Sequence, residues 1–114
     1  MTNLELKYRA LKILEKQPDL TQRQLAKKLG VSLGKTHYLV KSLTEIGWVK
    51  LDNFKKSNNK LGYAYLLTPA GVSQKAKIAA RFLIRKQREY NALQEEISLL
   101  KEEVRQLQDL NKYN

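Results

Sequence analysis

Basic and polar residues suited to recognising a nucleic acid fall in three short stretches of the chain, residues 21–23, 32–42 and 55–60. Lys and Arg donate hydrogen bonds to phosphate oxygens and to base edges, and hydroxyl, amide and imidazole groups can bond with either. The candidate contact residues are Thr21, Gln22, Arg23, Ser32, Gly34, Lys35, His37, Tyr38, Lys41, Ser42, Lys55, Lys56, Asn58, Asn59 and Lys60. Their types predict a surface that binds double-stranded DNA, with ordinary solvated helix faces and a charged turn as the alternatives.

The charge of the chain is strongly positive and unevenly distributed. The sequence has 22 Lys and Arg against 11 Asp and Glu, a net charge of +11. Residues 1–88 hold 19 of the basic and 5 of the acidic residues, whereas residues 89–114 hold 3 and 6. A basic region favours a polyanionic partner, because Lys and Arg that neutralise phosphates release condensed counterions. A solubilising surface is the alternative that charge alone leaves open.

Several kinds of chemistry are excluded by composition. The sequence has no cysteine and a single histidine, His37, so disulfides, thiolate metal sites, cysteine nucleophiles and multi-histidine metal sites are ruled out. We find no paired catalytic acids, nucleophile–base set or phosphate-cradling glycine loop, and expect no enzymatic activity, cofactor or metal. No apolar run approaches the roughly 20 residues of a membrane span, and the start does not resemble a secretory signal. A soluble cytoplasmic protein is expected.

The first expected element is a helix over residues 4–17, which Pro18 ends. Apolar residues at three- and four-residue spacing predict its buried face, namely Leu4, Tyr8, Leu11 and Leu14.

Two further helices are predicted with a short turn between them. Thr21 and Gln24 fit a capping box at the start of the second helix, and Gly30 is suited to its left-handed end. Ser32 is the expected N-cap of a third helix over residues 33–46, which Gly47 ends. The predicted buried residues are Leu25, Ala26, Leu29, Thr36, Leu39, Val40 and Leu43.

The residues after the third helix change from helical to strand-like patterning. Residues 48–54 and 61–67 are rich in strand formers and flank the polar stretch 55–60, which predicts a β-hairpin with a basic tip. Thr68 as N-cap and Pro69 at the first helical position predict a last helix that extends to about residue 111.

This order of elements predicts a mainly α fold with a small β-hairpin, a winged helix-turn-helix over residues 1–68 followed by a long helix over 69–114. The exposed face of the third helix would enter the major groove. There Lys35 and His37 would donate to guanine acceptors, and Tyr38 would reach a base or a phosphate. The start of the second helix would hold a phosphate, and the wing 55–60 would meet the backbone or the minor groove.

Parts of this region resemble the MarR family of bacterial regulators. Residues 21–32 are similar to the first half of a bacterial winged helix-turn-helix. Residues 40–49 (VKSLTEIGWV) resemble the family's L-x-x-x-G-hydrophobic-V close, and residues 66–71 (LLTPAG) its L-T-x-x-G passage from wing to helix. The resemblance covers about residues 5–100 and implies a DNA-binding transcriptional regulator.

A narrower resemblance is to the MarR-like regulators associated with exopolysaccharide loci. It is carried by residues 32–36 (SLGKT), by Asn53 and Phe54, and by residues 61–63 (LGY). It implies exopolysaccharide genes as targets. Only about 20 residues precede the helix-turn-helix, fewer than in typical MarR members, so dimerisation is expected to depend on the C-terminal helix.

Apolar residues of the last helix follow an unbroken heptad frame. From residue 90 they occupy its a and d positions, with a polar residue at the last a position: Tyr90, Leu93, Ile97, Leu100, Val104, Leu107 and Asn111. Extended backward, the frame places Leu83 at a and weakens at Lys86. β-Branched residues at a and leucines at d favour a parallel two-stranded coiled coil, and hence a homodimer. Antiparallel pairing, and a single helix folded back on its own domain, are the alternatives.

The sequence alone leaves two other functions open. The winged domain and the coiled coil could serve as a protein–protein interaction adaptor, although the lysine-rich wing argues for DNA. RNA binding would need a stacking platform, and only Tyr63 and Tyr65 offer one. The sequence identifies neither the operator nor a small-molecule effector.

Overall fold

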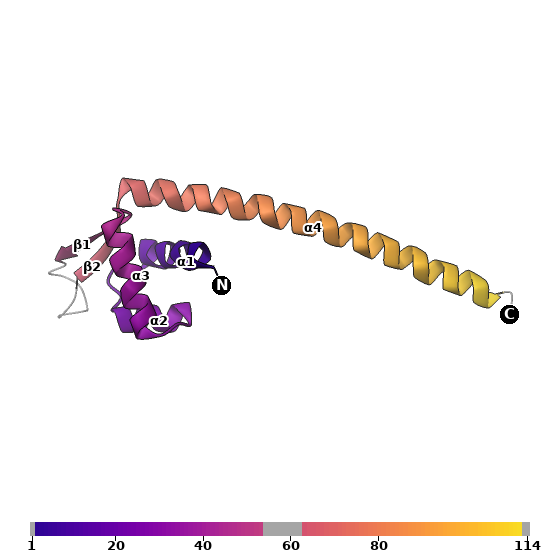
Figure 1. The fold of residues 1–114 in the computed structure, drawn as a ribbon, viewed down its shortest axis with the longest axis horizontal. Coiled ribbons are helices and arrows are strands. Elements are labelled where there is room, and N and C mark those ends of the chain that lie inside the picture. Colours follow the sequence, from indigo (N-terminus) through magenta and orange to yellow (C-terminus); the bar gives the residue numbers. More distant parts are fainter. Residues whose placement is uncertain (1, 54–62, 113–114) are drawn as a thin grey trace. The chain divides into compact units, whose positions relative to one another are not determined.

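The computed structural model describes residues 2–53 and 63–112 and is mostly helical. The elements are α1 (Asn3–Lys16), α2 (Gln22–Leu29), α3 (Leu33–Glu45), β1 (Val49–Asn53), β2 (Tyr63–Leu67) and α4 (Pro69–Lys112) (Figure 1). The predicted fold class, mainly α with a small hairpin and a long last helix, is confirmed. The chain divides into two compact units, residues 1–79 and 80–114.

The helix ends follow local hydrogen-bonding chemistry. The Thr21 hydroxyl accepts from the Gln24 backbone amide at 3.0 Å, and the Gln24 side chain accepts from the Thr21 amide at 2.9 Å, which completes the predicted capping box. Ser32 caps α3 in the same way, with its hydroxyl 3.1 Å from the Lys35 amide. Gly30 ends α2 with a φ of 72°, a left-handed conformation that glycine adopts without strain.

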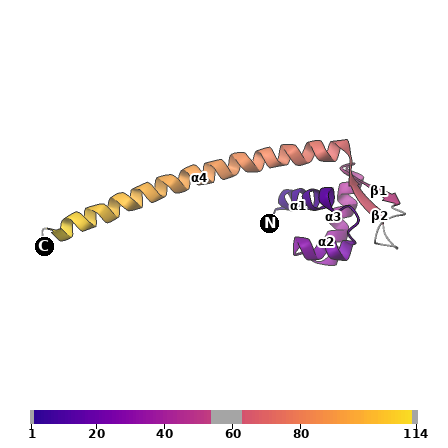
Figure 2. The same ribbon diagram turned by 180° about the vertical axis from the view of Figure 1, so that it is seen from behind.

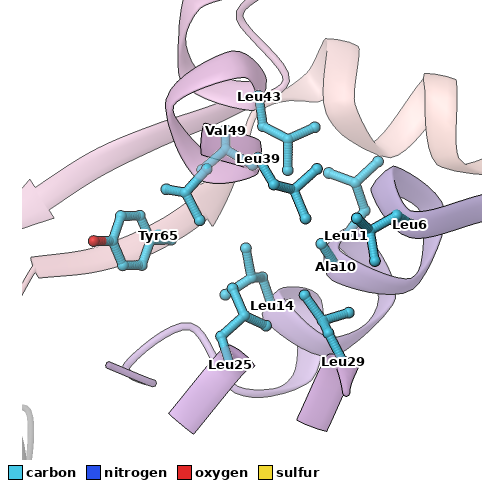
Figure 3. Packing of buried hydrophobic residues seen from close by; sticks show 11 residues of the cluster. Leu6, Ala10, Leu11, Leu14, Leu25, Leu29, Leu39, Leu43, Val49 and Tyr65 are labelled. Atoms are coloured by element: carbon cyan, nitrogen blue, oxygen red, sulfur yellow. The ribbon is translucent and has the colours of Figure 1, made fainter. Parts of the chain in front are cut away.

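A leucine-rich core joins α1, α2 and α3 to the hairpin (Figure 3). The buried faces predicted for α2 and α3 are confirmed, including the polar Thr36, whose hydroxyl donates to the Ser32 carbonyl at 2.9 Å. The core residues are Leu6, Ala10, Leu11, Leu14, Leu25, Leu29, Leu39, Val40, Leu43, Val49 and Tyr65.

The face predicted for α1 was partly wrong. Leu11 and Leu14 are buried as expected, but Leu4 and Tyr8 are only half-buried. The helix instead buries Leu6 and Ala10, which lie further round the same helical surface. Leu4 and Tyr8 therefore lie at the edge of the buried stripe, because α2 and β2 pack against α1 on the side that carries the other buried residues.

The hairpin is a two-stranded antiparallel sheet in which Val49 pairs with Leu67 and Leu51 with Tyr65 (Figure 2). Its second strand is tied to the start of the chain as well, since the Tyr65 amide donates to the Pro18 carbonyl at 2.8 Å. The two strands are thus fixed to the rest of the first unit by this backbone bond and by two core residues, Val49 and Tyr65.

The first turns of α4 belong to the first unit. The Thr68 hydroxyl accepts from the Gly71 amide at 3.0 Å, as expected of an N-cap, and the Thr68 amide donates to the Trp48 carbonyl at 3.0 Å. A Cβ at Gly71 would lie 2.0 Å from that same carbonyl oxygen, so only glycine allows this approach. Residues 69–79, which follow the boundary predicted near Thr68, are grouped with the winged domain.

The second unit is the rest of α4. Within residues 80–112 no side chain is buried, and among the described parts of the chain no helix is long and apolar enough to span a membrane.

Candidate nucleic-acid interface

Helix α3 separates a buried face from an exposed polar one. Thr36, Leu39, Val40 and Leu43 are buried, and the residues between them turn outward. Ser32, Gly34, Lys35, His37, Tyr38 and Lys41 are all exposed, whereas Ser42 is half-buried. The sequence-predicted residues of this helix therefore lie together on one accessible surface.

Tyr38 is the most conspicuous residue of that surface. Its side chain is 77% exposed, more than any other large hydrophobic residue of the described chain. An aromatic ring held in water by a rigid helix is suited to contact with a base or a sugar, since its face is apolar and its hydroxyl can bond with a phosphate.

Ser32 holds the start of α3 through its side chain and its carbonyl. The hydroxyl caps the helix, and the carbonyl accepts from both the Thr36 amide and the Thr36 hydroxyl. It fixes where the recognition surface begins and keeps one lone pair of the hydroxyl for an outside donor.

A side-chain contact joins the start of α2 to the exposed face of α3. The Gln22 side-chain oxygen is 3.1 Å from Nδ1 of His37, and the Gln22 nitrogen donates to the Tyr65 hydroxyl at 3.2 Å. One amide therefore connects α2, α3 and β2. Arg23, next to it, is exposed, and Thr21 is half-buried.

Two residues of this neighbourhood were not among those chosen from the sequence. Tyr65 packs the wing as expected, but its hydroxyl also points away from the leucine cluster (Figure 3) and holds Gln22. Lys7 lines, together with Lys35 and Tyr38, a hollow of about 470 Å³ between α1 and α3. Both residues are far from their partners in sequence, so no local spacing could have indicated them.

The predicted wing tip, Lys55, Lys56, Asn58, Asn59 and Lys60, lies outside the described residues. The structure describes the strands on either side of it, β1 to Asn53 and β2 from Tyr63.

The predicted dimerisation residues form an exposed stripe on α4. Their exposed fractions run from 42% at Ile97 to 64% at Leu83. The stripe consists of Leu83, Tyr90, Leu93, Ile97, Leu100, Val104 and Leu107, with Asn111 exposed at its end. From Tyr90 to Leu107 this apolar line is continuous, and on a water-exposed helix it indicates a surface that binds another apolar surface.

Within residues 2–53 and 63–112, no group of three or more His, Cys, Asp or Glu residues is arranged to hold a metal ion.

Comparison with known proteins identifies the fold. A family model described as winged helix-turn-helix DNA-binding matches residues 4–50, which contain α1, α2 and α3. The hairpin that follows supplies the wing. The first unit is a winged helix-turn-helix domain. No curated protein matches the chain.

Solved structures of MarR-family proteins share this fold. Wild-type MarR from E. coli has a TM-score of 0.54 and 25% identity, covering 63% of this chain and 52% of that chain. A mutant MepR from S. aureus has a TM-score of 0.64 and 19% identity, covering 94% and 77%. The PcaV transcriptional regulator from Streptomyces coelicolor has a TM-score of 0.62 and 18% identity, covering 96% and 79%.

The likeness to these structures is one of fold. The chain spans only 52% and 58% of the length of the first two structures matched, the E. coli protein and RV1404 from Mycobacterium tuberculosis. The winged helix-turn-helix arrangement is therefore what this chain shares with them.

Proposed function

We propose that the chain is a sequence-specific, double-stranded DNA-binding transcriptional regulator that acts as a homodimer. The observation that carries the proposal is the two-faced helix α3, which buries four residues and presents Lys35, His37, Tyr38 and Lys41 to solvent. A rigid helix with this pattern, in a winged helix-turn-helix, is suited to the major groove.

The other parts of the surface take supporting roles in this proposal. Arg23 and the free amides at the start of α2 would hold a phosphate, because helix N-termini attract anions. The wing residues 55–60 would contact the backbone or the minor groove. These contacts position the domain, whereas the side chains of α3 read the bases.

Selection of bound sequences from random duplex DNA, at stated salt concentrations, tests DNA recognition. We expect an inverted repeat whose half-sites lie about one helical turn, ~34 Å, or a multiple apart. Lys35→Ala should weaken binding by about 1–3 kcal/mol and relax the preference at one base pair. Replacing Lys55 and Lys56 together should weaken binding to all sequences and flatten the salt dependence by about two units of slope.

The matched control is Lys112→Ala, which removes the same charge from the end of the second unit. It should bind like the unchanged chain. Unaltered affinity in both the Lys35 variant and the double wing variant would refute the assignment of the surface.

The homodimer is proposed on the basis of the exposed apolar stripe of α4. Burying a leucine side chain contributes about 1.5–3 kcal/mol, so the six exposed a and d residues between 90 and 107 supply ample free energy for pairing. A second copy of the chain presents the same stripe in the same heptad register, which makes it a fitting occupant.

Leu100 and Leu99 offer a matched pair of variants. Both are leucines of α4 with similar exposure, 59% and 65%, but only Leu100 lies on the stripe. Leu100→Asp should convert the dimer to a monomer in sedimentation equilibrium, because it would bury two unpaired carboxylates. Leu99→Asp should leave the dimer intact, and equal effects of the two would refute pairing through the stripe.

The charges beside the stripe favour parallel pairing. Glu89, Glu96 and Glu103 occupy successive g positions of the frame. Antiparallel helices place g next to g and would align these carboxylates, whereas parallel helices place Glu96 near the partner's e position, which Lys101 occupies. Because the chain lacks cysteine, Asn111→Cys tests the orientation: only a parallel dimer brings the two thiols together to form a disulfide.

The target genes are a finer part of the proposal. The resemblance of residues 32–36 and 61–63 to exopolysaccharide-associated regulators supports control of exopolysaccharide genes. The selected operator sequence, searched against the genome that encodes the chain, tests this. Sites confined to other promoters would contradict it.

A further inference from the structure

The single histidine of the chain lies on the recognition surface and is held by a side chain of another helix. His37 is exposed on α3, and its Nδ1 atom is 3.1 Å from the Gln22 side-chain oxygen. The nitrogen of the same amide donates to the Tyr65 hydroxyl at 3.2 Å. Tyr65 in turn is anchored by its ring in the leucine core, with only 9% of the residue exposed.

This arrangement determines which ring nitrogen of a neutral histidine carries the proton. In this structure the Gln22 nitrogen donates to the Tyr65 hydroxyl, and the amide oxygen faces His37. An oxygen can only accept a hydrogen bond, and Nδ1 must therefore be the protonated nitrogen. The other ring nitrogen, Nε2, then carries a lone pair and no proton.

We propose that Gln22, held by Tyr65, fixes neutral His37 as the Nδ1–H tautomer, so that His37 offers DNA a hydrogen-bond acceptor at Nε2. In the major groove the exposed donors of the bases are the exocyclic amino groups of adenine and cytosine, whereas guanine and thymine present acceptors. His37 thus selects an adenine or a cytosine amino group. The base contact rests on the proposed function, and the tautomer does not.

The proposal reverses the role that the residue type alone predicts. A histidine considered without its neighbours would donate to guanine, as Lys35 does in the sequence-based interpretation. The titratable groups that line the same hollow as His37 are Lys41 and Glu45 of α3 and Tyr65 of β2. Gln22 also lines it and contacts the ring at Nδ1, and that contact leaves Nε2 available to a ligand.

Nitrogen NMR of the uniformly labelled full chain, without DNA, tests the tautomer. One histidine gives one imidazole spin system, so no assignment is needed. Above the pH range in which histidines ordinarily titrate, we expect a protonated-type shift at Nδ1 and an unprotonated-type shift at Nε2. The opposite pattern would overturn the proposal, since it requires a flipped Gln22 amide that donates to His37.

Three variants test whether Gln22 sets the tautomer of His37 or whether any change near the ring alters its signals. Gln22→Glu keeps an acceptor oxygen beside Nδ1 and should preserve the Nδ1–H tautomer. Gln22→Ala removes the acceptor and should shift the signals toward the other tautomer. Tyr65→Phe removes only the hydroxyl that anchors the Gln22 side chain, so it should weaken the preference for the Nδ1–H tautomer. Unchanged signals in both of these variants would show that Gln22 does not control the ring.

Duplexes that lack single amino groups test the base contact. In the selected operator, each adenine is replaced in turn by purine and each cytosine by 2-pyrimidinone, which lack the exocyclic amine. One replacement per half-site should weaken binding of the unchanged chain about five- to tenfold, the effect of one hydrogen bond. The same replacement should have no effect on His37→Ala.

The outcomes distinguish failure of the base contact from failure of the proposed function. If no position is sensitive to the missing amine while the chain binds its operator, the base contact is refuted and the proposed function stands. If the unchanged chain prefers no duplex sequence at all, the proposed function fails together with the base contact, and the NMR result still decides the tautomer.

Discussion

In the first unit Leu11, Leu25 and Leu43 have no exposed surface, whereas Leu93 and Leu100 of the second unit keep 53% and 59% of theirs. The two regions contain the same residue type in the same kind of helix. The difference lies in what each unit contains, because α1, α2, α3 and the hairpin cover one another in the first unit, whereas the second unit is a single helix. The winged domain is thus stabilised by its own elements, and we propose that the helix pairs through its apolar residues with a second copy of the chain.

The largest expected effect is a contrast between the same substitution in the two regions. Leu43→Ala should lower the free energy of unfolding by about 2–5 kcal/mol at any protein concentration, because it leaves a cavity in a packed core. Leu100→Ala should leave that unfolding transition in place and weaken dimerisation instead, so its effect depends on concentration. Chemical denaturation at two protein concentrations tells these apart.

If both variants responded to protein concentration in the same way, the two regions would not differ in what stabilises them. A Leu43→Ala variant whose stability varied with concentration would mean that the winged domain depends on the dimer. A Leu100→Ala variant that lost stability at all concentrations would mean that the stripe packs within its own chain.

An intermediate effect is expected where α4 enters the winged domain. A Cβ at Gly71 would meet the Trp48 carbonyl oxygen at 2.0 Å, so Gly71→Ala should destabilise the first unit by about 1–3 kcal/mol in thermal or chemical denaturation. Gly34→Ala is the control, because nothing lies within 4 Å of its Cβ position. That variant should be neutral or slightly stabilising, since alanine favours helix over glycine by about 1 kcal/mol.

The Gly71 and Gly34 variants together test where the winged domain ends along the chain. Loss of stability at Gly71 would show that the start of α4 is a structural part of the winged domain. Equal stability of both variants would mean that the contact with Trp48 relaxes without cost.

The smallest effect concerns a helix cap. Thr21→Ala removes the acceptor of the Gln24 amide and should cost about 0.5–2 kcal/mol of unfolding free energy. Thr21→Ser keeps the hydroxyl and should restore most of it, which denaturation of the three proteins would reveal. An alanine variant as stable as the serine variant would show that the cap is dispensable within so well packed a domain.

The sequence was most informative where the interactions are local. The caps at Thr21 and Ser32 and the glycine that ends α2 follow from hydrogen bonds and backbone angles within a few residues. The buried face of α3 follows from the helical repeat, since the residues that share one side are set by geometry alone. For the same reason the outward-facing candidates of α3 could be chosen before the structure was known.

Prediction failed where a choice depended on what packs against an element. Helix α1 has apolar residues on more than one side, and periodicity favoured Leu4 and Tyr8 over Leu6 and Ala10. The buried side of α1 is set by α2 and β2, which pack against it and which no local rule contains. The heptad stripe of α4 is the reverse case: its residues are exposed on the helix, and their pairing with a second copy stays a prediction.

From the sequence alone came the helices, their ends, the hairpin and the polar side of α3, because these depend on neighbours in the chain. Only the tertiary structure brought the Gln22 amide between His37 and Tyr65, residues 15 and 43 positions away from it. It alone showed that Gly71 is required by the carbonyl of Trp48. Contacts of this kind depend on how whole elements pack, and a single hydrogen bond of His37 then decides whether the residue offers DNA a donor or an acceptor.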